Sequence, residues 1–164
     1  MSLLEKVTNL AVLATCVAVG GDALHRHFVE SRAPSPYQVG ERLKDTPGLA
    51  LSRAGRTLII MTASTCHFCD DSMPFMRKLT GLAEQVGTRV VGVSVEDQAT
   101  NGAYLRGHGV SVDAVIPLKD NGLRAQPTPT LLLVRKDGTV ISAWRGKLDN
   151  AGEQKVFSAI EGTV

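Results

Sequence analysis

The sequence predicts an α/β domain with a mixed central β-sheet flanked by helices, preceded by an N-terminal hydrophobic helix. Strand-like and helix-like patterns alternate from about residue 48 onward, which is typical of parallel strands joined by helices. Near the end of the chain, Lys136-Asp137-Gly138 separates two apolar runs, and an Asp-Gly turn in that position predicts an antiparallel hairpin. Parallel crossovers combined with a terminal hairpin make the predicted sheet mixed.

Residues 1–24 are predicted to form a hydrophobic anchor or signal segment. Residues 7–24 are mostly apolar, but their apolar centre at 10–20 is short for a membrane span of about 20 residues. An uncleaved signal anchor is the preferred interpretation. A cleaved secretory signal, a lipoprotein-type signal ending at Cys16 and a soluble amphipathic helix are the alternatives. Cys16 itself is interpreted as a small buried apolar residue.

Residues 25–47 are predicted to be a linker and the start of an extension, and residues 48–164 to be the folded domain. Pro34 and Pro36 lie in a short polar stretch, and neighbouring prolines favour the extended backbone found in tethers. Together with the apolar segment before it, this stretch predicts a domain tethered to a membrane through residues 7–24.

Within the domain, each element follows from its pattern of apolar residues. Runs rich in aliphatic and β-branched residues predict strands at 57–63, 89–95, 114–118, 130–134 and 139–144. Apolar residues at helical spacing predict helices at 97–107 and 150–161, and a third that begins at a Cys-x-x-Cys motif. The apolar side of that third helix is expected to include Phe68 and Met73.

The composition is that of an ordinary globular protein. Of 164 residues, 43% are hydrophobic and 21% charged, which suits one domain with an appendage. The 18 basic residues nearly balance the 16 acidic ones, giving a net charge of +2. A protein that binds nucleic-acid phosphates needs a basic stripe, and none is apparent, so no nucleic-acid partner is expected.

The motif Cys66-His67-Phe68-Cys69 ends a buried strand and opens a helix, and this placement predicts redox chemistry. Unpaired backbone N–H groups and the helix dipole stabilise a thiolate there, which lowers the pKa of Cys66. Cys69 stands one turn later, within reach of the first sulfur, so it can resolve a mixed disulfide between Cys66 and a substrate. His67 is either a group that lowers the pKa of Cys66 further or an exposed spacer.

Two other interpretations of the cysteine pair have less support. A structural zinc site needs four ligands, usually from a second Cys-x-x-Cys or a spaced histidine pair, and His108 is a lone residue. Two thiols that flank the first turn of a helix are also hard to bury together, which argues against inert core cysteines. No metal site is therefore expected.

Five features, in order, resemble the thioredoxin superfamily and in particular the membrane-tethered TlpA/ResA-like redoxins. The resemblance extends from about residue 48 to residue 164, and residues 37–40 and 48–51 resemble that family's N-terminal extension. The features are Cys66-x-x-Cys69 after the central strand, Pro74 eight residues after Cys66, Thr128-Pro129-Thr130 before a Leu-rich strand, the Lys136-Asp137-Gly138 hairpin, and Gly146 before the last helix.

This resemblance implies a thioredoxin fold and roles for several residues. The family kinks its active-site helix at the position of Pro74. The proline at the position of Pro129 is cis in the family and lies against the cysteines, while the residue before it, here Thr128, pairs with an extended substrate chain. We therefore expect a cis Thr128–Pro129 bond, a trans bond at Pro127, and support of substrate binding by Thr128, Pro129 and His67.

Three positions depart from the thioredoxin pattern. Thioredoxins carry a buried acid six residues before the first cysteine, where this chain has Ile60, and a lysine on the next strand, where it has Gly92. Thr65 replaces the tryptophan that usually precedes the motif. The proton relay of ordinary thioredoxin is therefore absent or rebuilt. Thr128 before the proline, as in several extracytoplasmic Dsb-type proteins, favours a location outside the cytoplasm.

The expected function is that of a protein-disulfide oxidoreductase that uses Cys66 and Cys69, tethered to a membrane with its domain outside the cytoplasm. Its direction, reductase or oxidant, is left open. Protein thiols or disulfides are expected as substrates, together with a separate redox partner, no cofactor and a monomeric state.

Three alternatives have less support. A peroxiredoxin-like peroxidase needs Pro-x-x-x-Thr-x-x-Cys, but Ile59 and Ala63 stand at its proline and threonine positions. A copper-handling thioredoxin-fold chaperone normally uses a wider cysteine spacing and a distant histidine. A redox-inert interaction module would not need an intact Cys-x-x-Cys motif together with Pro129.

Overall fold

The computed structural model describes residues 35–162 of the chain. The predicted anchor at 1–24, Cys16 and most of the predicted linker lie outside the described residues. Within residues 35–162, no helix is long and apolar enough to cross a membrane. The compact unit that contains the sheet begins at Pro36.

The order of the elements agrees with the predicted alternation of strands and helices. The last helix has the predicted ends, whereas the first strand ends two residues earlier than expected because the chain turns toward the cysteines. The elements are the short 3₁₀ helix η1 (Leu51–Arg53), β1 (Arg56–Met61), α2 (His67–Gln85), β2 (Arg89–Ser94), α3 (Gln98–Gly107), β3 (Ala114–Pro117), the 3₁₀ helix η2 (Lys119–Asn121), β4 (Thr130–Arg135), β5 (Val140–Arg145) and α4 (Asn150–Glu161).

The five strands form one mixed sheet in the order β3-β2-β1-β4-β5. β1 pairs in parallel with β2, and β2 in parallel with β3, because α2 and α3 carry the chain back between them. β4 lies antiparallel to β1, and the Asp137-Gly138 turn returns the chain into an antiparallel β5. The predicted mixed sheet is confirmed, with β1 at its centre.

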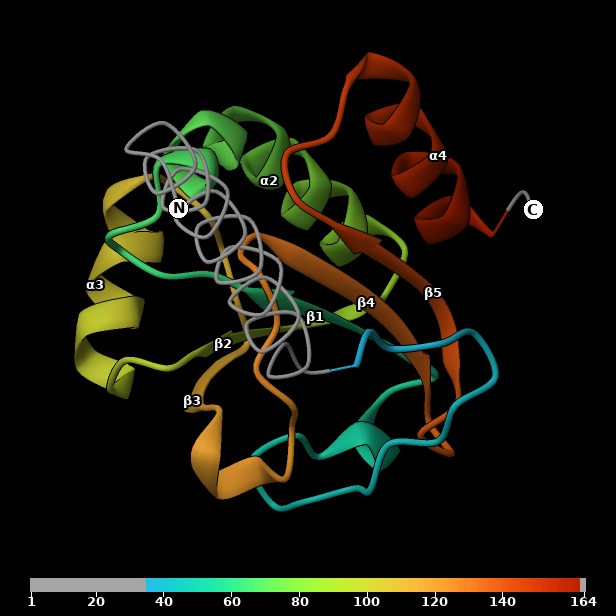
Figure 1. The fold of residues 1–164 in the computed structure, drawn as a ribbon. Helices are drawn as coiled ribbons and strands as arrows, with labels where there is room; N and C mark the ends of the chain where they lie inside the picture. Colours follow the sequence, from blue (N-terminus) through green and yellow to red (C-terminus); the bar gives the residue numbers. More distant parts are fainter. Residues whose placement is uncertain (1–34, 163–164) are drawn as a thin grey trace, which may run out of the picture. The chain divides into compact units, whose positions relative to one another are not determined.

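Helices α2, α3 and α4 cover one face of the sheet (Figure 1). Successive residues of a strand point to opposite faces, so Leu58 and Ile60 of β1 pack into this helical layer. The residues buried with them are almost all aliphatic. They include Cys69, Met73, Met76, Leu79, Leu105, Leu131, Leu133, Val156 and Ile160.

The opposite face is covered without a long helix. Ile59 and Met61 of β1 point this way and pack against the chain before β1 and around η2. The covering residues include Tyr37, Leu43, Leu49, Leu51 and Leu123. Residues 36–47, which the sequence placed in the linker and the start of the extension, therefore pack on the sheet as part of the compact unit.

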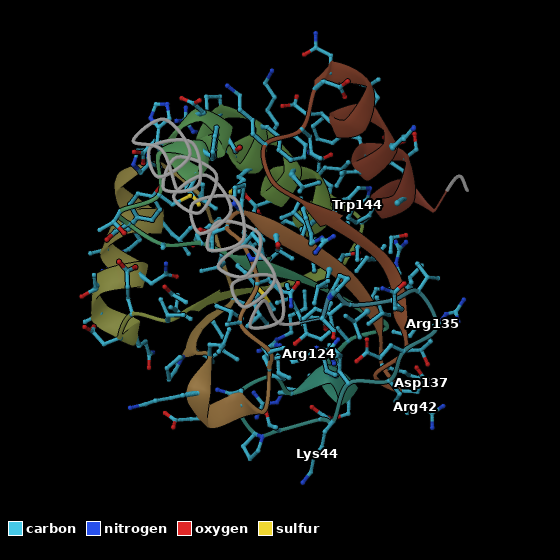
Figure 2. All side chains as sticks on the ribbon, in the orientation of Figure 1. Arg42, Lys44, Arg124, Arg135, Asp137 and Trp144 are labelled. Carbon is cyan, nitrogen blue, oxygen red and sulfur yellow. The ribbon has the colours of Figure 1, made fainter. Side chains whose placement is uncertain are left out.

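This extension passes closely over the β4–β5 hairpin. The Leu43 N–H donates to the Gly138 carbonyl oxygen at 2.8 Å. Gly138 has a φ of 87°, and a Cβ there would lie 2.2 Å from the Leu43 carbonyl oxygen, so only glycine permits this approach. Figure 2 shows Arg42 and Asp137 beside the turn, where they form an exposed ion pair at 3.5 Å.

A second link joins the extension to the loop that leads into β4. The Arg124 guanidinium donates to the Glu41 carboxylate at 2.8 Å and lies 4.1 Å from the centre of the Tyr37 ring. The backbone N–H of Arg124 donates to the Tyr37 hydroxyl at 2.6 Å. Arg124 is four residues before Thr128, so the extension also supports the segment expected to contact substrate.

The apolar side of α2 differs from the prediction at its first turn. Met73 is buried as expected, but Phe68 is 57% exposed. Cys69 in the same turn is completely buried, so the core-facing side of the helix start runs through Cys69 and Met73, and Phe68 lies outside it. Deeper in the helix, Ser72 and Thr80 are buried on the apolar side, because their hydroxyls donate to carbonyl oxygens of the preceding turn.

Candidate active site

The antiparallel pairing of β1 with β4 brings the two parts of the site together. Met61, the last residue of β1, pairs with Thr130, the first residue of β4. The chain that leaves β1 enters the cysteine motif, and the chain that enters β4 comes from Thr128-Pro129. Cys66 and Thr128, 62 residues apart in sequence, therefore meet at one edge of the sheet.

Cys66 is the N-cap of α2, and its sulfur takes the place of a capping oxygen. The sulfur accepts the Cys69 N–H at 3.3 Å, and the thiol donates to the Thr128 carbonyl oxygen at 3.2 Å. Partial burial alone would raise the pKa of Cys66. Hydrogen bonds from the Cys69 thiol, the Thr128 side chain and the backbone N–H groups of Cys69 and Phe68 outweigh burial and lower that pKa. A partly exposed thiol with a lowered pKa suits an attacking nucleophile.

Cys69 is a completely buried thiol on the helical side of the sheet. Burial and the hydrogen bond with Cys66 raise the pKa of Cys69 to about 12, although the Ala63 N–H and the Thr128 side chain also bond to its sulfur. Both cysteines are free thiols, and they lie within hydrogen-bond reach of each other. Two neighbouring thiols with such different pKa values can divide attack and resolution between them.

The Thr128–Pro129 peptide bond is cis, as predicted, and no other peptide bond in residues 35–162 is cis, so the bond before Pro127 is trans. Pro129 is buried, and its carbonyl oxygen accepts the N–H of Gly146 at 2.7 Å. Thr128 does more than the sequence indicated. In addition to accepting the Cys66 thiol at its carbonyl oxygen, its side chain bonds to the sulfurs of both cysteines.

His67 lies at the surface beside the pair. Its side chain is 80% exposed, and its Nε2 lies 3.7 Å from the Asp71 carboxylate, one turn along α2. Asp71 also accepts the Lys147 ammonium at 2.9 Å; this hydrogen bond, with the charges of Lys147 and His67, lowers the pKa of Asp71. The main groups that lower the pKa of Cys66 do not include His67. This geometry fits the exposed-spacer interpretation better than a tuning role.

Asp70, the other acidic residue after the motif, is bonded to α3. The Tyr104 hydroxyl donates to Asp70 at 2.7 Å, and the His108 Nε2 lies 3.9 Å from the same oxygen. Burial and the bond to Asp70 raise the pKa of Tyr104, so it remains a neutral donor. Asp70 is therefore held by partners on α3, and only the folded structure shows them.

The positions that hold the acid and the lysine of thioredoxin are adjacent and apolar in this chain. Ile60 is completely buried in β1 and pairs in register with Gly92 of β2. A Cβ on Gly92 would lie 2.8 Å from Leu105 Cδ1 and 3.6 Å from Asn101 Oδ1, so α3 fills the space that a side chain would need. The thioredoxin acid–lysine pair is absent here, and this part of the core holds a buried amide.

Glu96 is a neighbour of the site that the sequence analysis did not single out. It follows β2, whose carboxyl end lies beside that of β1 because the two strands are parallel. Its carboxylate accepts the N–H of Ser64 at 3.0 Å and the Ser64 hydroxyl at 2.5 Å, two residues before Cys66. The sequence signal that could have identified Glu96 is an acidic residue just after β2, the strand that runs parallel to β1 and ends beside the cysteine motif.

The structure also shows where Pro74 and the two positions of the peroxidase motif lie. Pro74 lies inside α2, which continues through it to Gln85. Ile59, at the proline position of the peroxidase motif, is completely buried in β1, and Ala63 lies in the turn after that strand. In the part of the chain from 35 to 162, no group of three or more histidine, cysteine or acidic side chains is arranged to hold a metal ion.

Solved structures with the same fold include redox proteins. One is a candidate thiol:disulfide interchange protein DsbE from Chlorobium tepidum, with a TM-score of 0.57 and 21% identity over 75% of this chain and 98% of that one. Another is the thioredoxin domain of a thiol-disulfide oxidoreductase from Bacteroides vulgatus, with a TM-score of 0.54 and 16% identity over 80% and 99%. A third is peroxiredoxin Q from Xanthomonas campestris, with a TM-score of 0.51 and 17% identity over 66% and 80%.

Sequence comparison is less informative. No family model matches the chain, and no curated protein matches its sequence. The structural likeness, at these low identities, establishes the fold. The chain has the thioredoxin fold that its sequence predicted.

Proposed function

We propose that this protein is a thiol–disulfide oxidoreductase that acts on protein thiols or disulfides through Cys66 and Cys69. The observation that carries the proposal is the contrast between the two sulfurs. Cys66 is partly exposed and has a lowered pKa, whereas Cys69 is buried and has a raised pKa. The proteins that share its fold include some named for thiol:disulfide interchange, which supports the same activity here.

In the reductive direction, the Cys66 thiolate attacks one sulfur of a substrate disulfide. A bond forms between those two sulfurs, the substrate S–S bond breaks, and the other substrate sulfur leaves as a thiolate that takes up a proton. Cys69 then loses its proton and attacks the Cys66 sulfur. This closes the Cys66–Cys69 disulfide and releases the remaining substrate sulfur as a thiol. The same steps run in reverse when the protein donates its disulfide, and a separate redox partner resets the pair.

Thr128 and Pro129 support substrate binding in this proposal. The Thr128 carbonyl oxygen lies 3.2 Å from the Cys66 sulfur, so an extended chain paired with the Thr128 backbone would bring its own sulfur to Cys66. His67 and Phe68, which directly follow Cys66 in the chain, are both largely exposed and offer one polar and one apolar side chain to a substrate.

The proposal is tested by trapping the mixed disulfide in a Cys16→Ala background, which removes the third thiol. Reduced Cys69→Ser protein is expected to form stable mixed disulfides with an oxidised protein substrate, seen as reductant-sensitive bands on a non-reducing gel. Cys66→Ser protein is expected to form almost none. Trapping by the Cys66→Ser variant alone would reverse the assigned roles, and no exchange by the unsubstituted pair would contradict the function. The reduction potential of the pair against glutathione then shows the direction.

We further propose that the domain works outside the cytoplasm, tethered to a membrane through residues 7–24. The apolar composition of that segment and the threonine before Pro129 support this location. Deleting residues 1–30 is expected to leave a soluble, folded and redox-active domain that no longer sediments with membranes. A truncated chain that aggregates or loses disulfide exchange would show that the segment is not a tether.

A further inference from the structure

The turn between β1 and α2, residues 62–65, is held by a carboxylate from the neighbouring strand. Both oxygens of Glu96 accept the Ser64 N–H, at 3.0 and 3.1 Å, and one of them accepts the Ser64 hydroxyl at 2.5 Å. The Ser94 hydroxyl donates to the same carboxylate at 3.2 Å and accepts the Glu96 N–H at 3.1 Å. The carboxylate is therefore fixed at both its own backbone and its oxygens.

The same turn is also held from α3. Asn101 is completely buried, and its Nδ2 donates to the Thr62 hydroxyl at 3.0 Å. The Asn101 side chain also bonds to Glu96, so the two residues form one polar cluster. Although burial would raise the pKa of Glu96, the hydrogen bonds from Ser64, Ser94 and Asn101 outweigh it, and the pKa of Glu96 is lowered. Glu96 is therefore a charged acceptor near neutral pH.

This turn carries the backbone groups that touch both cysteines. The Ala63 carbonyl oxygen accepts the Cys66 N–H at 3.1 Å, and the Ala63 N–H bonds to the Cys69 sulfur. The Ala63 carbonyl and the Ser64 N–H belong to one planar peptide unit. By holding the Ser64 N–H, Glu96 sets the direction in which the Ala63 carbonyl points toward the Cys66 N–H, and it limits the movement of the adjoining Ala63 N–H near the Cys69 sulfur.

We propose that Glu96 is a positioning residue of the redox pair, which binds Ser64 and thereby holds the Ala63 backbone against Cys66 and Cys69. The inference rests on the proposed function and deepens it. Ile60 leaves the pair without the buried acid of thioredoxin, and Glu96 reaches the cysteines through a backbone turn instead. The positioning role of Glu96 and its negative charge have opposite effects on the stability of the thiolates. A negative charge near the pair would disfavour a thiolate, whereas a well-placed Ala63 N–H favours the thiolate of Cys69.

The test follows the two steps separately in Glu96→Gln protein, in the Cys16→Ala background. Ellman's reagent releases one coloured thiolate when Cys66 attacks it and a second when Cys69 resolves the mixed disulfide. Glutamine keeps the size of the side chain but has only one acceptor oxygen. The donors that bind the two oxygens of Glu96 would have to share it. If the Ala63 N–H loses its place and the pKa of Cys69 rises by about one unit, the second phase slows about three- to tenfold near neutral pH.

Asp97→Asn is the matched control. Asp97 is the adjacent carboxylate and caps α3: its side chain accepts the Thr100 N–H at 2.8 Å and the Thr100 hydroxyl at 2.9 Å, both within the first turn of α3. It is expected to leave both phases unchanged even if it lowers the unfolding temperature. A Ser64→Ala variant keeps the N–H and loses only the hydroxyl, so it is expected to slow the second phase less than Glu96→Gln.

The pH profile of the second phase separates positioning from a general loosening of the fold. Between pH 7 and 9 the rate of that phase rises with the thiolate fraction of Cys69, and the Glu96→Gln protein is expected to reach a given rate only at a higher pH than the unsubstituted protein. An unchanged profile, a faster second phase as a charge effect would give, or equal slowing in the Asp97→Asn control would each overturn the inference. Ellman's reagent needs no protein-docking surface, so this experiment remains decisive even if the protein fails to exchange disulfides with protein substrates.

Discussion

Helices α2 and α3 begin in the same way and differ in the atom that caps them. Each follows a parallel strand, and each starts after an extended residue whose side chain accepts the N–H three residues later. In α3 a carboxylate oxygen of Asp97 accepts the Thr100 N–H at 2.8 Å, and in α2 the Cys66 sulfur accepts the Cys69 N–H at 3.3 Å. Backbone N–H groups of the first turn help to lower the pKa of both caps, but at Cys66 the Cys69 thiol and the Thr128 side chain contribute more.

The difference shows how one local structure serves either stability or reactivity. An aspartate cap is ionised at neutral pH in the folded and the unfolded chain, so the helix start gains a strong hydrogen bond and no chemistry. A thiol cap is ionised near neutral pH only where hydrogen bonds stabilise the thiolate, and at Cys66 the N–H groups of the helix start do so together with the Cys69 thiol and the Thr128 side chain. At α2 a sulfur replaces the oxygen cap, so the hydrogen bond is weaker but the capping group can act as a nucleophile.

The largest effect expected from this comparison is the difference between the two cysteines. The pKa of Cys69 is about 12, whereas the pKa of Cys66 lies below the ordinary thiol value of 9.0. Near neutral pH, alkylation of Cys66 is expected to be at least about 30-fold faster, after allowance for the weaker intrinsic nucleophilicity of a less basic thiolate. Timed alkylation of the reduced protein followed by peptide mass spectrometry measures both rates. Equal rates would remove the basis for assigning attack to Cys66.

A pH dependence of stability follows from Cys69. Its folded pKa is raised, so its contribution to stability is fully present below the unfolded value of 9.0 and is lost as pH rises through about 12. Cys66 has the opposite sign: its contribution is present above the unfolded value and is lost as pH falls through its lowered pKa. Denaturant unfolding of the reduced protein should therefore show a steeper loss of stability from pH 9.0 upward than unfolding of Cys69→Ser protein. Parallel curves would contradict the raised pKa.

A smaller effect is expected at the start of α4, which has an oxygen cap like that of α3. The Asp149 carboxylate accepts the Gly152 N–H at 2.7 Å. Asp149→Ala is expected to lower the free energy of unfolding by about 1 kcal/mol and to leave the rate of disulfide exchange unchanged. Denaturant unfolding and the Ellman assay measure the two quantities on one sample. A slower exchange rate would show that an oxygen cap on another helix also affects the reactivity of the cysteines.

The smallest effect is expected at His67. Its ring is 80% exposed and pairs with Asp71 at 3.7 Å, and exposed pairs of this kind contribute little. His67→Ala is expected to change the alkylation rate of Cys66 by less than about twofold. The matched variant Asp71→Asn, which removes the partner of the ring, should have an equally small effect. A tenfold slower Cys66 in His67→Ala protein alone would restore the tuning role.

The part of the site that the sequence predicted is the part encoded locally. The placement of Cys66 and Cys69 at a helix start depends on neighbours within a few residues, whereas the cis bond before Pro129 was expected from the family resemblance. Helical spacing could not show that Phe68 is exposed, because the apolar residues Phe68 and Cys69 are adjacent and the spacing did not decide which of them faces the core. Residues 36–47 also lack a clear period, so their burial became visible only on the folded sheet.

Glu96 shows the other limit. Its bonds to Ser64 join residues 32 positions apart, and they exist because two parallel strands end side by side. A sequence pattern marks an acidic residue after a strand but not the backbone group that it will bind. The same holds for Asn101, whose bond to the Thr62 hydroxyl joins residues 39 positions apart.

The link between Arg124 and the extension determines where a pulling force on the preceding chain would act on the domain. The compact unit begins at Pro36, so a pull on the preceding chain reaches Tyr37 and Glu41 first. Both hold Arg124, which stands four residues before Thr128. Tension on the preceding chain would therefore reach the loop that leads into β4 and, through the backbone hydrogen bonds of the extension, the β4–β5 hairpin.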